Sequence, residues 1–149
     1  MATTQYVIFR LQELLLGVEI LTIKEVLSYR KITPIPSLHS FIKGLINLRG
    51  TIMPVFDPRE RFRLPDVSYT PFHVILVMEI QGRVMGILAD EILDVLEIDS
   101  PSFQDTTNLP PGLQTQYLKG IAHEGSNMIL LLDMNRLLSQ EEVEALDAT

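Results

Sequence analysis

Residue types that could carry catalysis are few in this chain of 149 residues. Cysteine is absent, which excludes a thiolate nucleophile, a disulfide framework and every metal site that needs cysteine. The three histidines, His39, His73 and His123, are too scattered for the spacing of metal ligands. We interpret them as structural or surface residues.

The densest acidic segment is the strongest candidate for a metal site. Apolar residues alternate with its carboxylates, and it lacks the glycine that a calcium loop needs at its sharp turn. We therefore interpret it as the solvated face of a strand. Phosphate-cradling, dinucleotide-binding and nucleophile-elbow motifs are missing as well, so we expect no catalysis, no metal and no other cofactor. The acidic residues are Asp90, Glu91, Asp94, Glu97 and Asp99.

The charge of the chain is strongly uneven. A net charge of −7 argues against a general nucleic-acid binder, which needs a basic surface. Residues 1–63 hold nine Lys/Arg against five Asp/Glu, a net of +4, and residues 64–149 hold three against fourteen, a net of −11. Two interpretations stay open: chance differences between solvated faces, or two docking surfaces of different charge.

Membrane insertion and export are not expected. The longest apolar runs are far shorter than the roughly eighteen residues of a spanning helix, and residues 1–5 lack the basic and apolar regions of a secretory signal. We expect a cytoplasmic protein.

Short segments rich in Val, Ile, Leu and aromatic residues predict a β protein. Hairpins are expected around Gln12-Glu13, Arg49-Gly50 and Gln81-Gly82, because these polar or glycine-containing pairs separate apolar runs. Asp57-Pro58 is typical of an N-cap followed by proline, and predicts a short helical turn. Ser139 and Glu142 form a capping box that predicts a C-terminal helix over residues 139–147.

The pattern restarts halfway along the chain, which is the signature of a duplication. Residues 41–44 match residues 117–120 at an offset of 76, and residues 25–27 match residues 94–96 at an offset of 69. We therefore expect one domain over residues 1–149 with two copies, at residues 5–63 and 72–138. Five short strands in each copy favour a small barrel, because an open sheet of that size would leave two unpaired edges.

One motif resembles a known family. Residues 44–57, Gly-Leu-Ile-Asn-Leu-Arg-Gly-Thr-Ile-Met-Pro-Val-Phe-Asp, are similar to the signature of the CheW family of chemotaxis coupling proteins, and the similarity covers nearly the whole chain. The resemblance implies an all-β fold of two SH3-like, five-stranded β-barrels with short helices. It also implies a non-catalytic adaptor at receptor arrays, which joins the cytoplasmic tips of chemoreceptors to the regulatory domain of the histidine kinase CheA.

The resemblance also implies binding residues. A receptor-binding groove would be lined by Ile20, Ile23, Glu25, Gly44 and Arg49, although the isoleucines could equally be core residues and Glu25 could pair with Arg49. Arg49 is favoured as functional, because a guanidinium at a turn can bind a partner carboxylate through two nitrogens.

Further positions follow from the same resemblance. The kinase-facing surface would lie around Val95, and Gly50 and Gly120 would be structural turn positions. Pro58 departs from the family, which commonly has an aliphatic residue there. Two other functions stay open: an enzyme on a β-barrel scaffold, and an adaptor in an array that controls twitching motility or transcription.

Overall fold

Ten strands, a 3-10 turn and one short helix make up the described part of the computed structural model, residues 3–35, 42–65, 67–99 and 117–137. This confirms the prediction of an all-β protein with short helices. The first half contains β1 (Thr3–Leu11), β2 (Leu14–Glu19), the 3-10 turn η1 (Ile20–Thr22), β3 (Ile23–Ser28), β4 (Ile42–Leu48) and β5 (Thr51–Phe56). The second half contains β6 (Val74–Ile80), β7 (Arg83–Ala89), β8 (Glu91–Asp99), β9 (Leu118–Glu124), β10 (Asn127–Leu132) and α1 (Met134–Leu137).

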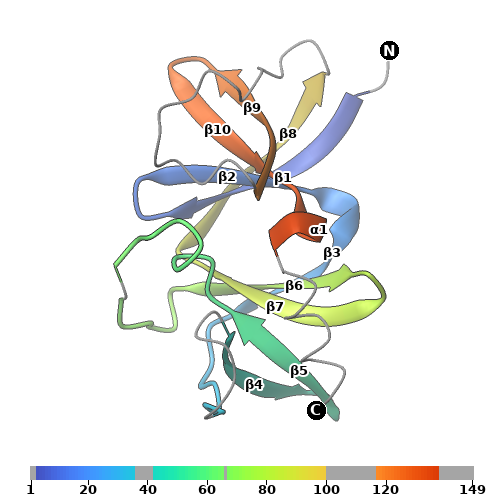
Figure 1. Ribbon diagram of the computed structural model, residues 1–149, viewed down its shortest axis with the longest axis vertical. Helices are drawn as coiled ribbons and strands as arrows, with labels where there is room; N and C mark the ends of the chain where they lie inside the picture. The colour runs from blue at the N-terminus through green and yellow to red at the C-terminus, as the bar shows by residue number, and fades with distance from the viewer. Residues whose placement is uncertain (1–2, 36–41, 66, 100–116, 138–149) are drawn as a thin grey trace.

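The strands form two five-stranded sheets (Figure 1). Sheet A has the order β8-β1-β2-β10-β9, and sheet B has the order β3-β6-β7-β5-β4. Within each sheet the strands pair antiparallel except for one parallel pair, β2 with β10 in sheet A and β5 with β7 in sheet B. Two five-stranded units are therefore present, as predicted.

Each sheet combines strands from both sequence copies. The β1–β2 hairpin of the first copy completes the sheet that contains β8, β9 and β10, and the β6–β7 hairpin of the second copy lies between β3 and β5. The expectation that each copy folds into its own five-stranded unit is therefore wrong. The segments 5–63 and 72–138 mark the repeat in the sequence. In the structure each segment contributes one hairpin to the sheet that holds the remaining strands of the other segment. The charge difference between the halves of the chain consequently does not separate one sheet from the other.

Strand register confirms the duplication. In both copies a lysine sits in a β-bulge: pairing skips Lys43 between β4 and β5, and skips Lys119 between β9 and β10. The parallel pairs correspond as well, because Val55 faces Gly86 and Leu131 faces Gly17. These positions follow the two sequence offsets, so the repeat describes a real equivalence of backbone positions.

The core has one shared part and one part for each sheet. Alternate residues of a strand point to opposite faces, so Phe56 enters the shared cluster and its neighbour Val55 enters a cluster of sheet B. Val7 and Ile8 divide in the same way between the shared cluster and a cluster of sheet A. Burial on both faces explains why the strands are continuous apolar runs.

The local predictions have different outcomes. Residues 58–63 form consecutive turns in which the Phe62 amide donates to the Pro58 carbonyl at 3.3 Å, as the predicted helical turn requires, and Asp57 caps them by accepting a hydrogen bond from the Arg59 amide at 3.0 Å. Gly120 lies inside β9, where it faces Leu131, and is not a turn residue. Gly50 does lie in the β4–β5 turn, with φ of 86°. The predicted helix over residues 139–147 falls outside the described part of the chain.

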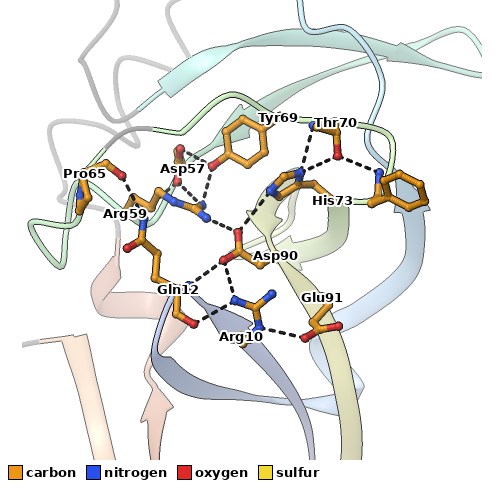
Figure 2. A network of polar contacts seen from close by, with 11 residues as sticks. Arg10, Gln12, Asp57, Arg59, Pro65, Tyr69, Thr70, His73, Asp90 and Glu91 are labelled. Atoms are coloured by element: carbon orange, nitrogen blue, oxygen red, sulfur yellow. Dashed lines mark hydrogen bonds and ion pairs between the residues drawn. The ribbon is translucent and has the colours of Figure 1, made fainter.

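A buried ion network lies where the two sheets meet (Figure 2). The Arg59 side chain is 1% exposed, and those of Asp57 and Asp90 are 2% and 9% exposed. Arg59 Nη1 donates to the Tyr69 hydroxyl at 2.7 Å and lies 3.5 Å from Asp57 Oδ1, while Nη2 pairs with Asp90 Oδ1. The Tyr69 hydroxyl donates in turn to Asp57.

Asp90 connects this network to sheet A. It follows β7 of sheet B and precedes β8 of sheet A, so it marks the point where the chain crosses between them. Its Oδ2 accepts a hydrogen bond from the Gln12 amide at 2.7 Å and another from Arg10 Nη1 at 3.3 Å. The acidic pattern predicted that Asp90 lies on a solvated strand face, and this prediction is wrong because the Asp90 side chain is only 9% exposed. His73, whose Nε2 lies 3.5 Å from Asp90 Oδ1, has the structural position expected of it.

The network shifts the pKa values of its members. Burial alone would raise the pKa of Asp90, but the Gln12 amide and the Arg59 and Arg10 guanidinium groups outweigh it and lower that pKa. Burial alone would lower the pKa of Arg59, and its phenolic and carboxylate neighbours raise it overall. Burial and the bond to Asp57 raise the pKa of Tyr69. Both carboxylates therefore face a cation that stays charged.

We expect Arg59→Met to lower the free energy of unfolding by about 3–5 kcal/mol, because it removes the buried cation that Asp57 and Asp90 share and, among the described residues, leaves Asp90 with Arg10 as its remaining arginine partner. Denaturant unfolding measures the loss. Arg30→Met, which changes an exposed arginine, is the control and should stay within about 0.5 kcal/mol of the wild type. Equal losses in the two variants would contradict a stabilising role for the network.

We expect Gly44→Val and Gly120→Val each to lower the free energy of unfolding by about 1–3 kcal/mol. The larger loss is expected at Gly44, where φ is 155° and an added Cβ would clash with the Thr33 carbonyl oxygen. Chemical denaturation of both variants provides the comparison. A neutral Gly120→Val would show that the two glycines share a register position without sharing a structural role.

Candidate functional site

Two groups of the ion network have shifted pKa values that do not suit acid–base catalysis. A general acid or base works best when its pKa lies near the working pH. Tyr69 has a raised pKa and Asp90 a lowered one, so both pKa values are moved away from neutrality. Among the described residues, no three acidic or histidine side chains gather in a way that could hold a metal ion.

The clearest surface feature is an ion pair between β3 and the β4–β5 turn. Arg49 Nη2 binds Glu25 Oε1, and the side chains are 68% and 32% exposed. Arg49 has a positive φ of 52° in the turn, which Gly50 completes. The Gly50 amide donates to Asn47 Oδ1 at 2.8 Å and so braces the turn that carries Arg49. Of the alternatives considered for Glu25, pairing with Arg49 is the one found.

This ion pair borders a shallow groove of about 300 Å³. Apolar side chains, including Leu48, Met53 and Val77, line the groove beside the two charged groups. Such a surface offers an apolar floor, an anion and a cation to the same ligand. It suits a polypeptide segment that carries both apolar and charged side chains, which is the usual anatomy of a protein interface.

The other predicted receptor residues lie elsewhere. Ile20, in η1, and Ile23, at the start of β3, are half-buried and pack against the shared core, which agrees with their interpretation as core residues. Ile20 also lines a separate depression beside the start of β1. Gly44 is buried in β4 next to Thr33, so its backbone requirement explains it. The structure therefore brings together Glu25 and Arg49, and leaves the remaining three outside their groove.

Val95 lies on β8, the edge strand of sheet A, and is 45% exposed. Leu93, two residues earlier on the same strand, is also 45% exposed. The corresponding edge strand of sheet B is β3, where Val26 is 47% exposed. Val26 was not singled out from the sequence, although the offset of 69 residues relates it directly to Val95. Exposed apolar side chains on an unpaired strand edge are typical of a contact surface.

Within the described part of the chain, no helix is both long and apolar enough to cross a membrane.

Comparison with known proteins gives one consistent result. The family model described as CheW-like domain matches residues 5–142. The chain is 36% identical over 143 residues to Chemotaxis protein CheW from Klebsiella aerogenes, an alignment that covers 96% of this chain and 86% of that protein. It is 29% identical over 140 residues to Protein FrzA from Myxococcus xanthus, covering 90% of this chain and 84% of that protein.

A solved structure agrees with this assignment. The scaffolding protein TtCheW from Thermoanaerobacter tengcongensis superimposes with a TM-score of 0.82 at 32% identity, covering 95% of this chain and 92% of that one. The match therefore extends over both sheets and the crossings between them. Because the family model matches residues 5–142 and a relative that is 36% identical aligns over 96% of this chain, the chain belongs to the CheW family.

Proposed function

We propose that the chain is a non-catalytic adaptor that couples chemoreceptors to the histidine kinase CheA at membrane-associated arrays in the cytoplasm. The observation that supports this proposal is that a groove with a charged rim and an exposed apolar strand edge lie on different sheets. The groove at Glu25 and Arg49 belongs to sheet B, and the exposed edge at Val95 belongs to sheet A. An adaptor needs two surfaces that can be occupied at the same time.

The receptor is assigned to the groove of sheet B. Arg49 reaches solvent from a braced turn, and within the described residues its guanidinium binds Glu25 through Nη2, so its other N–H donors face no described partner. A receptor carboxylate can take those nitrogens while apolar receptor side chains cover the groove floor. The Glu25 pair holds the guanidinium in place before binding, which reduces the side-chain entropy lost on association.

The kinase regulatory domain is assigned to the edge of sheet A. Val95 and Leu93 offer an apolar strip on β8, and the unpaired edge of β8 offers backbone groups beside it. A partner of similar β fold can cover such an edge without changing the adaptor. The receptor and kinase then contact different sheets of one rigid body.

We expect Arg49→Glu to weaken binding of a receptor cytoplasmic-tip fragment by about 2–5 kcal/mol, because it places two carboxylates where a cation met the receptor. Stability should change by no more than about 1 kcal/mol, since the pair is exposed. Calorimetric titration and denaturant unfolding of the same variant give both numbers.

A charge-swapped variant, Glu25→Arg with Arg49→Glu, is the matched control. It restores the intramolecular ion pair while reversing its polarity, so stability should return and receptor affinity should stay low. Full recovery of receptor affinity in the swapped variant would mean that Arg49 only braces Glu25. A lowered unfolding midpoint with unchanged affinity would make Arg49 a structural residue.

We expect Val95→Asp to weaken binding of the kinase regulatory domain by about tenfold or more, because it places a charge in the centre of an apolar contact. Receptor-fragment affinity should not change. Val26→Asp, at the equivalent position on the edge of sheet B, is the matched control and should retain kinase binding. Surface plasmon resonance with each partner separates these effects. Equal loss of kinase binding in both variants would refute the assignment of the kinase to sheet A.

A further inference from the structure

The buried ion network has a counterpart in the other copy that is open. A cavity of about 270 Å³ lies against the β6–β7 turn and the start of α1. Its residues correspond to network residues through the two sequence offsets: Asp133 corresponds to Asp57, Asn135 to Arg59 and Gln81 to Gln12. The cavity is therefore the equivalent, in the second copy, of the space that the Arg59 side chain fills in the first.

The backbone frame around the two spaces is the same. Asp133 accepts a hydrogen bond from the Asn135 amide at 3.0 Å, as Asp57 accepts one from Arg59 at the same distance. Gln81 has a φ of 52° in its turn, and Gln12 has a φ of 54°. The side chains around this frame differ, and at position 135 a short amide stands where Arg59 extends its guanidinium.

Three carboxylates line the cavity. At positions equivalent to Arg10 and Leu88 of the network side, the cavity has Glu79 and Glu19, and Asp133 keeps the carboxylate of Asp57. Lys119 is the one cation among the described residues that line the cavity. The counterpart of Asp90 is Leu21, which is 96% exposed, so the carboxylate of Asp90 is not repeated at the equivalent position.

These carboxylates already have partners on the rim of the cavity. Glu79 pairs with Lys24 at 3.1 Å, Glu19 with Lys119 at 3.2 Å and Asp133 with Arg136 at 3.3 Å. The first two carboxylates are about half exposed, and exposed ion pairs contribute little to stability. A ligand that binds several carboxylates at once can therefore replace these pairs at small cost.

We propose that this cavity binds the guanidinium group of an arginine side chain from a partner protein, in the manner in which Arg59 occupies the equivalent space. Arg59 donates to Tyr69 through Nη1 and to Asp90 through Nη2. A planar guanidinium offers separate nitrogens to acceptors on different sides, whereas the ammonium group of a lysine has one nitrogen. The cavity and the Glu25–Arg49 groove are lined by different residues, and they meet at Lys24 of the groove, which pairs with Glu79 of the cavity. The proposal does not depend on the assignment of receptor or kinase to either surface.

The test uses the full-length ¹⁵N-labelled chain, with N-acetyl-arginine amide as the probe and N-acetyl-lysine amide as its comparison. Saturable amide shifts are expected at Gln81, Asp133 and Asn135 with the arginine probe, and weaker ones with the lysine probe. Glu79→Gln combined with Asp133→Asn should weaken the arginine probe by about tenfold. Asn can still cap the Asn135 amide through its side-chain oxygen, so the fold should be retained.

Glu124→Gln, which changes an exposed acid of β9 outside the cavity, is the control and should bind the probe as the wild type does. Unfolding midpoints of all variants confirm that the fold is intact. Shifts that do not saturate, shifts that centre elsewhere, equal affinity for the lysine probe, or unchanged affinity in the double variant would each overturn the proposal.

Discussion

The burial of Arg59 is the constraint on which the arrangement of the two sheets depends. A guanidinium removed from water is stable only when anions and hydrogen-bond acceptors surround it, and an unpaired one would cost several kcal/mol. Its partners come from the turn after β5, the segment before β6 and the crossing between β7 and β8. Asp90 then extends the contact to the β1–β2 turn of sheet A. One buried cation therefore ties together segments that are distant in sequence.

The two copies have kept one backbone frame and diverged in the polar side chains that occupy it. The bulges at Lys43 and Lys119 and the parallel pairs at Gly86 and Gly17 are set by main-chain hydrogen bonds and close packing. Side chains that line the space between hairpin and turn are under no such constraint. One copy uses this space for an internal cation, and the other leaves it open to solvent.

Local features of the fold could be predicted from the sequence, and pairing over long distances could not. Apolar runs separated by polar or glycine turns indicated the hairpins, and repeated offsets indicated the duplication. The parallel pair of β5 with β7 gives no local signal, so the exchange of hairpins went unseen. Arg59 lies in a charged segment that looks solvent-exposed, and its burial depends on Asp90, which lies 31 residues further along the chain, as well as on the nearby Asp57. For the same reason the sequence left open whether Glu25 meets Arg49, which needs two strands at opposite edges of sheet B.

The exchange of hairpins also determines the order in which the protein can fold during synthesis. When β1 to β5 have left the ribosome, the chain holds two strands of sheet A and three strands of sheet B. Sheet A then lacks the strands on both sides of β1 and β2, and sheet B lacks the two strands between β3 and β5. The β6–β7 hairpin must arrive before β3 and β5 belong to one sheet, and β8 to β10 must follow before β1 and β2 are covered. Such long loop closures are slow and leave strand edges exposed meanwhile. Neither half of the chain is therefore an autonomous folding unit, and the nascent protein depends on its last strands to bury its first.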